Sequence, residues 1–452
     1  MKKRYWPIFI IVLAMVAMLG LLSFIQGRMN AIRVENHLTD VDPLENAPPL
    51  VAFTSVALGG FRGLLGDWLW LRSSKMQDEG KYFEMVQLAN WIVKLQPRFT
   101  GSHAFLAWNM AYNVSVTFTN FEDRWRWVKR GIELIRDEAL EFNPGDPELF
   151  RQLGWIYQHK MGKDLDDANR YYKTEFAKEM IRLFGDYYGQ WEIIQKAPLE
   201  ENKLKAVLEN KPDFWNILAA NGYKNFLEFE QEFRHLAVIP EKVAGQLEEA
   251  GIKETVELCL RHRWMVNKYR LEPKWLLKLN KRYGNLEWRL PEAHAIYWAE
   301  RGKEKWHSAI DTFKRLSCDR MIFQSLNNAF QMGRLVYLKD IEHLEMTPNI
   351  SLVDAVDKAY RDVQEYYEES HVEGAYVNFL VDAVVCLYKF GEKSKAKEYI
   401  DKGRAMNPGR FKLNLEEFVL HELAEDMEAA SYQHAQGTVQ GYLLQAYYQL
   451  AI

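Results

Sequence analysis

The fold class is decided by a stretch between Glu138 and Tyr157, which reads EALEFNPGDPELFRQLGWIY. Its first part carries apolar residues at helical spacing and ends at Asn143-Pro144. Proline stops a helix because it lacks a backbone N–H and clashes with the preceding turn. After Pro147 the apolar residues resume at helical spacing. The stretch therefore predicts the end of one helix, a turn and the start of the next helix.

Two other segments show related punctuation. EGKYFEMVQLANWIVKLQP contains Gly80 and Pro97, FGEKSKAKEYIDKGRAMNP contains Gly391 and Pro408, and the glycine and the proline have the same spacing in both. A turn glycine joins one helix to the next, and a proline ends the second helix about four turns later. A further segment, PEAHAIYWAERG, opens at Pro291 in a similar way. Such self-similarity predicts a repeat architecture.

These motifs resemble tetratricopeptide repeats (TPRs), over roughly residues 66–185 and 291–410. No unit matches at every position, and the unit at 100–144 has an insertion after its first helix, around Thr117 to Phe121. The resemblance implies a solenoid of helix hairpins whose concave face, lined mainly by first helices, binds a partner. The residues that carry it are Leu153, Gly154, Tyr157, Ala139, Pro144, Gly80, Tyr82, Pro97, Gly391, Ala396 and Pro408.

The chain outside the repeats divides further. TPR-like repeats are predicted at 50–185 and 291–410. Residues 186–290 break the period and are predicted to be an inserted helical subdomain, although FLEFEQEF, from Phe226 to Phe233, also has the alternation of a strand. Residues 411–452 are predicted to form two C-terminal helices, because a solenoid needs a polar cap on its apolar end.

An uncharged apolar run, PIFIIVLAMVAMLGLLSFI, extends from Pro7 to Ile25. As a helix it spans roughly 28 Å, close to the hydrocarbon thickness of a bilayer. We therefore expect a transmembrane anchor at 7–25, after a cytoplasmic tail at 1–6 and before a linker at 26–49. A cleaved signal peptide is the alternative, but the run is long for one and no A-x-A site follows it.

Basic residues precede the apolar run at Lys2, Lys3 and Arg4. By the positive-inside rule they place the N-terminus in the cytoplasm. The protein is thus predicted to be single-pass, with most of its chain in the periplasm and its anchor in a bacterial inner membrane. A second apolar stretch, Leu50 to Leu71, contains charges that are costly in lipid. We expect it to lie on the membrane surface or inside the first repeat; a second span is the alternative.

Composition and motifs bear on the class of function. The net charge is −4 and no long basic block is present, which argues against nucleic-acid binding. The three cysteines are far apart and form no CxxC pair. The chain carries no GxxxxGK[ST], GxSxG, HExxH or GxGxxG motif. We therefore predict no catalytic residues, no metal site and no cofactor, and a protein that is not an enzyme.

A peptide-binding groove is predicted on the first helices. Their rings, amides and cations suit an extended peptide or its carboxylate. For the tryptophans, the alternative is packing between helices. The predicted groove residues are Trp70, Gln77, Arg151, Trp155, Gln158 and His159.

Cations and tryptophans interleave in RWRWVKR, Arg124 to Arg130. The ordinary interpretation is a solvated basic helix face with its tryptophans buried. The alternative is contact with an anionic lipid or a partner, made by Arg124, Arg126, Lys129 and Arg130.

Together these features predict an all-α fold, a TPR-like solenoid of helix hairpins preceded by one transmembrane helix. The expected function is a membrane-tethered scaffold that binds protein or peptide partners in the cell envelope. A secretion, pilus or polysaccharide-export assembly is suggested by analogy of fold alone. The alternatives are an enzyme or enzyme subunit with its site in 186–290, and a peripheral lipid-binding module using Leu50–Leu71 and Arg124–Arg130.

Overall fold

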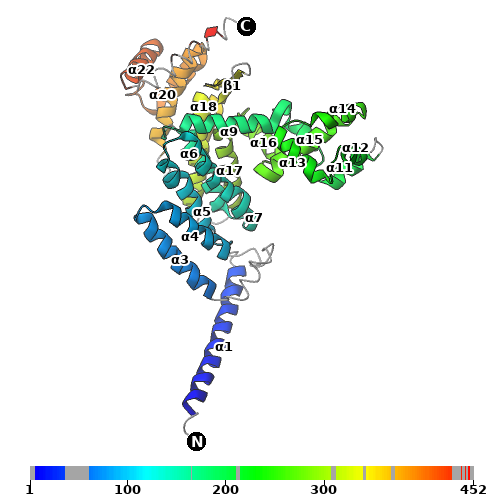
Figure 1. The fold of residues 1–452 in the computed structure, drawn as a ribbon. Helices are drawn as coiled ribbons and strands as arrows, with labels where there is room; N and C mark the ends of the chain where they lie inside the picture. Colours follow the sequence, from blue (N-terminus) through cyan, green and yellow to red (C-terminus); the bar gives the residue numbers. More distant parts are fainter. Residues whose placement is uncertain are drawn as a thin grey trace.

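The computed structural model describes residues 6–35, 61–163, 165–209, 214–306, 312–338, 343–367 and 372–429, together with residues 439, 443, 446 and 447. Helices make up nearly all the regular structure in these ranges, and a two-stranded sheet is the exception (Figure 1). The all-α class predicted from the sequence is confirmed.

Three helical hairpins follow one another in the described residues between 61 and 184. The first joins α3 (Phe61–Asp78) to α4 (Tyr82–Leu95). The second pairs two long continuous helices, one of α5 (Thr100–Trp108), η2 (Asn109–Val114) and η3 (Ser115–Thr117), the other of α6 (Phe121–Glu133), η4 (Leu134–Ala139) and α7 (Leu140–Phe142). The third joins α8 (Pro147–Trp155) and η5 (Ile156–Gly162) to α9 (Asn169–Phe184).

Local chemistry explains these boundaries. Gly80 has a φ of 71° and makes the turn between α3 and α4. This left-handed conformation suits glycine, which has no Cβ to clash. Asp146 caps α8 by accepting from the backbone N–H of Glu148 at 2.8 Å, with Pro147 in the first turn, and both are favoured residues at a helix start. The extra residues predicted around Thr117 lengthen the first helix of the second hairpin and form the short turn that follows it.

The third hairpin packs against a helix distant in sequence. Helix α8 lies along α17 (Pro291–Lys305), which pairs in turn with α18 (Thr312–Met332). The contact is close because it is made through glycine on both helices. A Cβ on Gly154 of α8 would lie 3.3 Å from the carbonyl oxygen of Ala295, and one on Gly302 of α17 would lie 3.3 Å from that of Pro147. These reciprocal contacts show that α8 and α17 run antiparallel.

The residues between α9 and α17 form a separate group of helices that projects to one side of the molecule (Figure 1). FLEFEQEF is helical, and the strand alternative does not hold: Phe226, Phe229 and Phe233 are buried on one side of their helix. The elements are η6 (Gly185–Tyr187), α10 (Trp191–Lys196), α11 (Glu201–Leu208), α12 (Phe214–Ala220), α13 (Phe226–Leu236), α14 (Glu241–Glu249), α15 (Lys253–Arg263), η7 (Trp264–Lys268) and α16 (Pro273–Tyr283).

An antiparallel β-hairpin follows α18, and it was not predicted from the sequence. It joins β1 (Arg334–Leu338) to β2 (His343–Thr347), with Leu335 opposite Met346. Leu335 packs with Ala177 and Leu290 in a small apolar cluster apart from the main core.

The chain then returns to helices: η10 (Ile350–Leu352), α19 (Val353–Tyr366), α20 (Glu373–Lys389), α21 (Lys393–Met406) and α22 (Leu415–Ala429). Helices α20 and α21 form a hairpin around the turn glycine Gly391, and α22 packs on α20. Of the two terminal helices predicted after residue 411, α22 is one. Most of the second falls outside the described residues.

Helix α1 (Trp6–Glu35) contains the whole apolar run from Pro7 to Ile25 and extends away from the helical body (Figure 1). In the part of the chain that the structure describes, no helix combines the length and the apolar character needed to cross a membrane. The predicted boundary between the anchor and the linker is wrong, because α1 continues through residues 26–35 of the predicted linker. Residues 1–5 of the predicted tail, residues 36–49 of the predicted linker and the first part of Leu50–Leu71 lie outside the described residues.

Candidate binding face on the first helices

Four aromatic rings from two neighbouring hairpins contact one another in a row, as two stacked pairs joined by one tilted contact. Trp155 of α8 lies flat on His159 of η5, with ring centroids 4.5 Å apart and an interplanar angle of 14°. The Tyr112 hydroxyl, from η2, is 3.2 Å from His159 Nδ1. Trp108 of α5 stacks on Tyr112 at 5.6 Å. We call Trp108, Tyr112, Trp155 and His159 the aromatic face.

The backbone brings these rings together through two π-helical segments. Each ring pair within one helix is four residues apart, so its members lie on the same side. Tyr112 and His159 are in η2 and η5, where the α-helical hydrogen bonding widens to a π-helix and the two segments contact each other. Such widened turns in helices are frequent at functional sites, because they redirect side chains from the regular helical positions.

The aromatic face is uncharged at neutral pH. Burial lowers the pKa of His159 below its ordinary value, and the nearby ammonium groups of Lys163 and Lys160 lower it further. Burial raises the pKa of the Tyr112 phenol. The Lys160 ammonium lies 5.3 Å from the Tyr112 ring centroid, but it is paired with Asp166 at 2.5 Å. The face therefore presents neutral rings and a polar imidazole.

Part of the aromatic face remains open to solvent. Trp108 is 38% exposed, while Tyr112, Trp155 and His159 are half-buried. Large flat rings that keep a polar atom within reach are typical anchors of protein interfaces. The geometry is therefore suited to apolar or aromatic side chains of a partner, with the imidazole available for one hydrogen bond.

The structure brings together only two of the six predicted groove residues, Trp155 and His159. Gln158 is buried and donates to the Met321 carbonyl and to Gln324, both on α18. Arg151 is held by Glu148 at 2.5 Å.

The other two predicted groove residues lie on α3. Trp70 packs against Phe99 and Phe105, so for this tryptophan the packing alternative describes its contacts. Gln77 is half-buried near the end of the helix. Sequence reasoning missed Trp108 and Tyr112, although their four-residue spacing was a visible signal.

The basic stretch from Arg124 to Arg130 is paired with acids throughout. Arg124 is mostly buried and contacts Asp166 at 3.2 Å and also Asp167. The remaining cations are paired as well: Arg126 with Glu122 and Asp123, Lys129 with Glu179, and Arg130 with Glu138.

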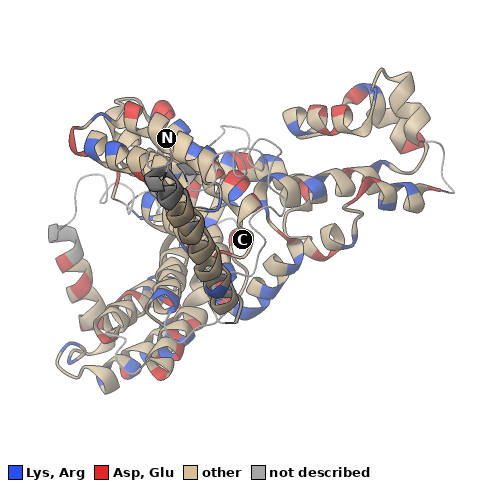
Figure 2. Ribbon diagram, turned by 90° about the horizontal axis from the view of Figure 1, so that it is seen from below, with Lys and Arg blue, Asp and Glu red and all other residues tan. Residues whose placement is uncertain are grey.

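Of the two tryptophans in this stretch, Trp125 is buried against Tyr172, whereas Trp127 is half-buried beside Phe83. Figure 2 shows the same mixing of basic and acidic residues over the helical body. The geometry favours a structural role over lipid contact for these cations.

One group of side chains on α22 has the arrangement of possible metal ligands among the described residues. His421, Glu422 and Glu425 place ligand atoms within 4.8 Å of one another. The Arg410 guanidinium already donates to Glu422 and supplies a positive charge there. These three side chains therefore form a surface cluster in which Glu422 is already paired with Arg410.

A small cavity of about 30 Å³ lies where the 186–290 segment meets the hairpins. It is enclosed by α6, η4 and α9 on one side and η7 on the other, and it contains the buried guanidinium of Arg136. Arg136 forms an ion pair with Asp137 at 2.6 Å and lies 5.0 Å from the Tyr269 ring centroid. These contacts dock the segment onto the hairpins and leave space for about one water molecule.

Comparison of the chain with protein-family models, with curated proteins and with solved structures gives no match.

Proposed function

We propose that this protein is a membrane-tethered scaffold whose aromatic face binds a segment of another protein in the cell envelope. The observation that carries the proposal is the row of contacting rings in the aromatic face, which joins two hairpins and keeps an exposed edge. A partner segment with apolar side chains would cover this edge and gain free energy by burying it, at roughly 25 cal/mol per Å².

The tether in this proposal is α1. Leu13, Met15, Val16 and Met18 are each more than half exposed and lie on different sides of the helix. A helix that is apolar on all sides must be covered by lipid or protein. Together with the uncharged run from Pro7 to Ile25 and the basic residues before it, this supports a single-pass anchor with the hairpins outside the cytoplasm.

The repeat architecture is also part of the proposal. The hairpins α3/α4 and α20/α21 turn at Gly80 and Gly391, both with positive φ, and α4 and α21 end just before Pro97 and Pro408. These features support a TPR-like solenoid, in which neighbouring hairpins present their first helices on one face. Trp155 lies in such a helix, as do Trp108 and Tyr112.

Site-specific cross-linking tests the binding face. The photoreactive residue p-benzoylphenylalanine is placed at Trp155 in the full chain in living cells, and for comparison at Phe313, which is exposed on α18. We expect a discrete cross-linked product from position 155, none from position 313, and loss of the product when Tyr112→Ala is added. Equal products from both positions would contradict the proposal.

The anchor is tested separately by membrane extraction. The full chain is expected to stay with membranes in alkaline carbonate, and a chain lacking residues 1–35 is expected to be released. A reporter active only outside the cytoplasm, fused to the C-terminus, should be active in the full chain. An inactive reporter in a membrane-bound chain would reverse the proposed orientation.

A second candidate function, peripheral lipid binding, is favoured by one feature of α3. Leu64, Trp68 and Leu71 are exposed along one side of this helix, and the Arg72 guanidinium lies 5.6 Å from the Trp68 ring centroid. This pattern suits the boundary between lipid headgroups and acyl chains. The test is flotation with anionic vesicles of the chain lacking residues 1–35, compared with its Trp68→Ser variant. If the variant floats equally well, or if neither chain floats, α3 does not bind the membrane surface.

A further inference from the structure

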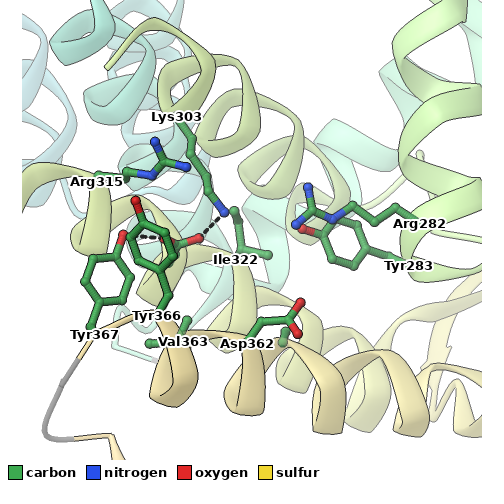
Figure 3. A pocket seen from close by; sticks show the side chains of 11 residues that line it. Arg282, Tyr283, Lys303, Arg315, Ile322, Asp362, Val363, Tyr366 and Tyr367 are labelled. Atoms are coloured by element: carbon green, nitrogen blue, oxygen red, sulfur yellow. Dashed lines mark hydrogen bonds and ion pairs between the residues drawn. The ribbon is translucent and has the colours of Figure 1, made fainter. Parts of the chain in front are cut away.

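A cavity of about 200 Å³ lies where four helices meet, and it shares no residue with the aromatic face. Its walls come from α16, α17, α18 and α19, with Tyr367 just after α19 (Figure 3). Ile322, Ala359 and Val363 supply an apolar surface. The remaining lining is charged or phenolic, so the cavity offers both an apolar wall and polar groups, as ligand sites do.

Most charges around the cavity are already compensated. Lys303 forms an ion pair with Asp319, whose carboxylate also accepts from the Tyr367 hydroxyl at 2.8 Å. Arg282 lies 3.2 Å from the buried carboxylate of Glu300. These groups hold one another in place and leave little net charge for a ligand.

Arg315 differs from these cations. No hydrogen bond or ion pair joins its guanidinium to another described residue, and its Nε is buried without an acceptor. The guanidinium lies 5.4 Å from the Tyr366 ring centroid, an arrangement that leaves its N–H edge available. Figure 3 shows Arg315 and Arg282 on opposite sides of the cavity. A buried donor with no acceptor is costly, and an oxyanion in the cavity would relieve that cost.

The charge of the ligand is limited by Asp362. This carboxylate lines the same cavity and has no ion-pair partner among the described residues. It would repel the second negative charge of a phosphate dianion, whereas a carboxylate brings a single charge, matched by Arg315 alone. The apolar wall then needs an apolar body, and a cavity of about 150 Å³ is enough for a benzene ring.

We propose that this cavity binds a small organic monocarboxylate, with the carboxylate on Arg315 and the apolar body against Ile322 and Val363. The guanidinium donates two N–H groups to the two carboxylate oxygens. The ligand thereby bridges α18 and α19, the helices that supply the cation and most of the apolar wall.

Binding of benzoate to the full chain in lipid nanodiscs tests the proposal, measured by calorimetry with empty nanodiscs subtracted. Benzamide, which has the same shape without the charge, and inorganic phosphate serve as comparison ligands. We expect benzoate to bind at least about tenfold more tightly than either. Equal binding of benzamide would overturn the role of charge, and tighter binding of phosphate would overturn the monocarboxylate assignment.

Matched variants locate the site. Arg315→Gln should weaken benzoate binding at least about tenfold, whereas Lys314→Gln should not, because Lys314 is exposed and lies over Trp306. Asp362→Asn should tighten binding, and Glu365→Gln should leave it unchanged, because Glu365 is an exposed carboxylate of the same helix that does not line the cavity. If Arg315→Gln does not fold, Arg315→Lys removes the paired N–H geometry and should still weaken binding. Benzoate binding that is insensitive to Arg315, or equally sensitive to Lys314, overturns the proposal.

Discussion

A buried ion pair ties the third hairpin to the helix that follows the 186–290 segment, and its removal makes a sharp prediction. Lys173 Nζ of α9 lies 3.0 Å from Glu292 Oε1 of α17, and the two side chains are 8% and 3% exposed. The other carboxylate oxygen of Glu292 is buried without a hydrogen-bond partner. The pair therefore sits where water cannot replace a missing partner.

Replacing one partner leaves a buried charge alone. Lys173→Met, or Glu292→Leu, should each lower the free energy of opening this contact by about 3–5 kcal/mol. Replacing both residues removes both desolvation penalties, so the double variant should be within about 1 kcal/mol of the natural protein or more stable than it. The control is Lys278→Met, because Lys278 and Glu304 pair at 2.7 Å but are about half exposed. This exposed pair should contribute less than about 1 kcal/mol.

Hydrogen exchange with mass spectrometry measures this free energy locally, on peptides that cover α17. Since about 1.4 kcal/mol is a factor of ten, each single variant should exchange roughly one hundred to several thousand times faster there. The double variant should exchange at nearly the natural rate. Single variants that exchange like the control, or a double variant whose loss equals the sum of the single losses, would refute the reasoning.

Three further outcomes are expected. A Cβ on Gly131 would lie 2.7 Å from the Ala107 carbonyl oxygen, whereas one on Gly245 would meet open space. In urea unfolding, Gly131→Ala should therefore destabilise the second hairpin by about 1–3 kcal/mol, and Gly245→Ala should stabilise its helix by up to about 1 kcal/mol. Burial lowers the pKa of His294 to about 4. Between about pH 6.5 and pH 4 the unfolded chain therefore binds a proton that the folded chain does not. About 3 kcal/mol of stability, present above about pH 6.5, should be lost as the pH falls to about 4. The His294→Asn variant should not show this loss, and an equal loss in the variant and the natural protein would contradict the prediction. Burial raises the pKa of the Cys259 and Cys318 thiols to about 12, so iodoacetamide at about pH 8 should label them only after unfolding.

The sequence by itself determined the helical class and several helix boundaries. Gly80, Pro147 and Pro291 mark turns or helix starts in the structure, because such residues act on the backbone within one helical turn. The β-hairpin was missed for a related reason. Each strand is short and shows little alternation of apolar and polar residues. Leu335 is buried only because it packs against Ala177 and Leu290, which are distant in the sequence.

The candidate binding face was only half predictable. Trp155 and His159 share one helix face by spacing alone, but Tyr112 joins them from another hairpin. The basic stretch illustrates the opposite case. Its cations are visible in the sequence, yet the Asp166 and Glu179 carboxylates that pair with Arg124 and Lys129 come from residues more than forty positions away.

The tertiary structure alone decided which helices are neighbours. Helix α8 packs on α17 across the whole 186–290 segment, and Gly154 and Gly302 allow that approach. The sequence shows both glycines, but it does not show that each one faces the helix that carries the other. Helix formation depends on residues a few positions apart, whereas the choice of a partner helix depends on matching surfaces and charges that only the folded chain brings together.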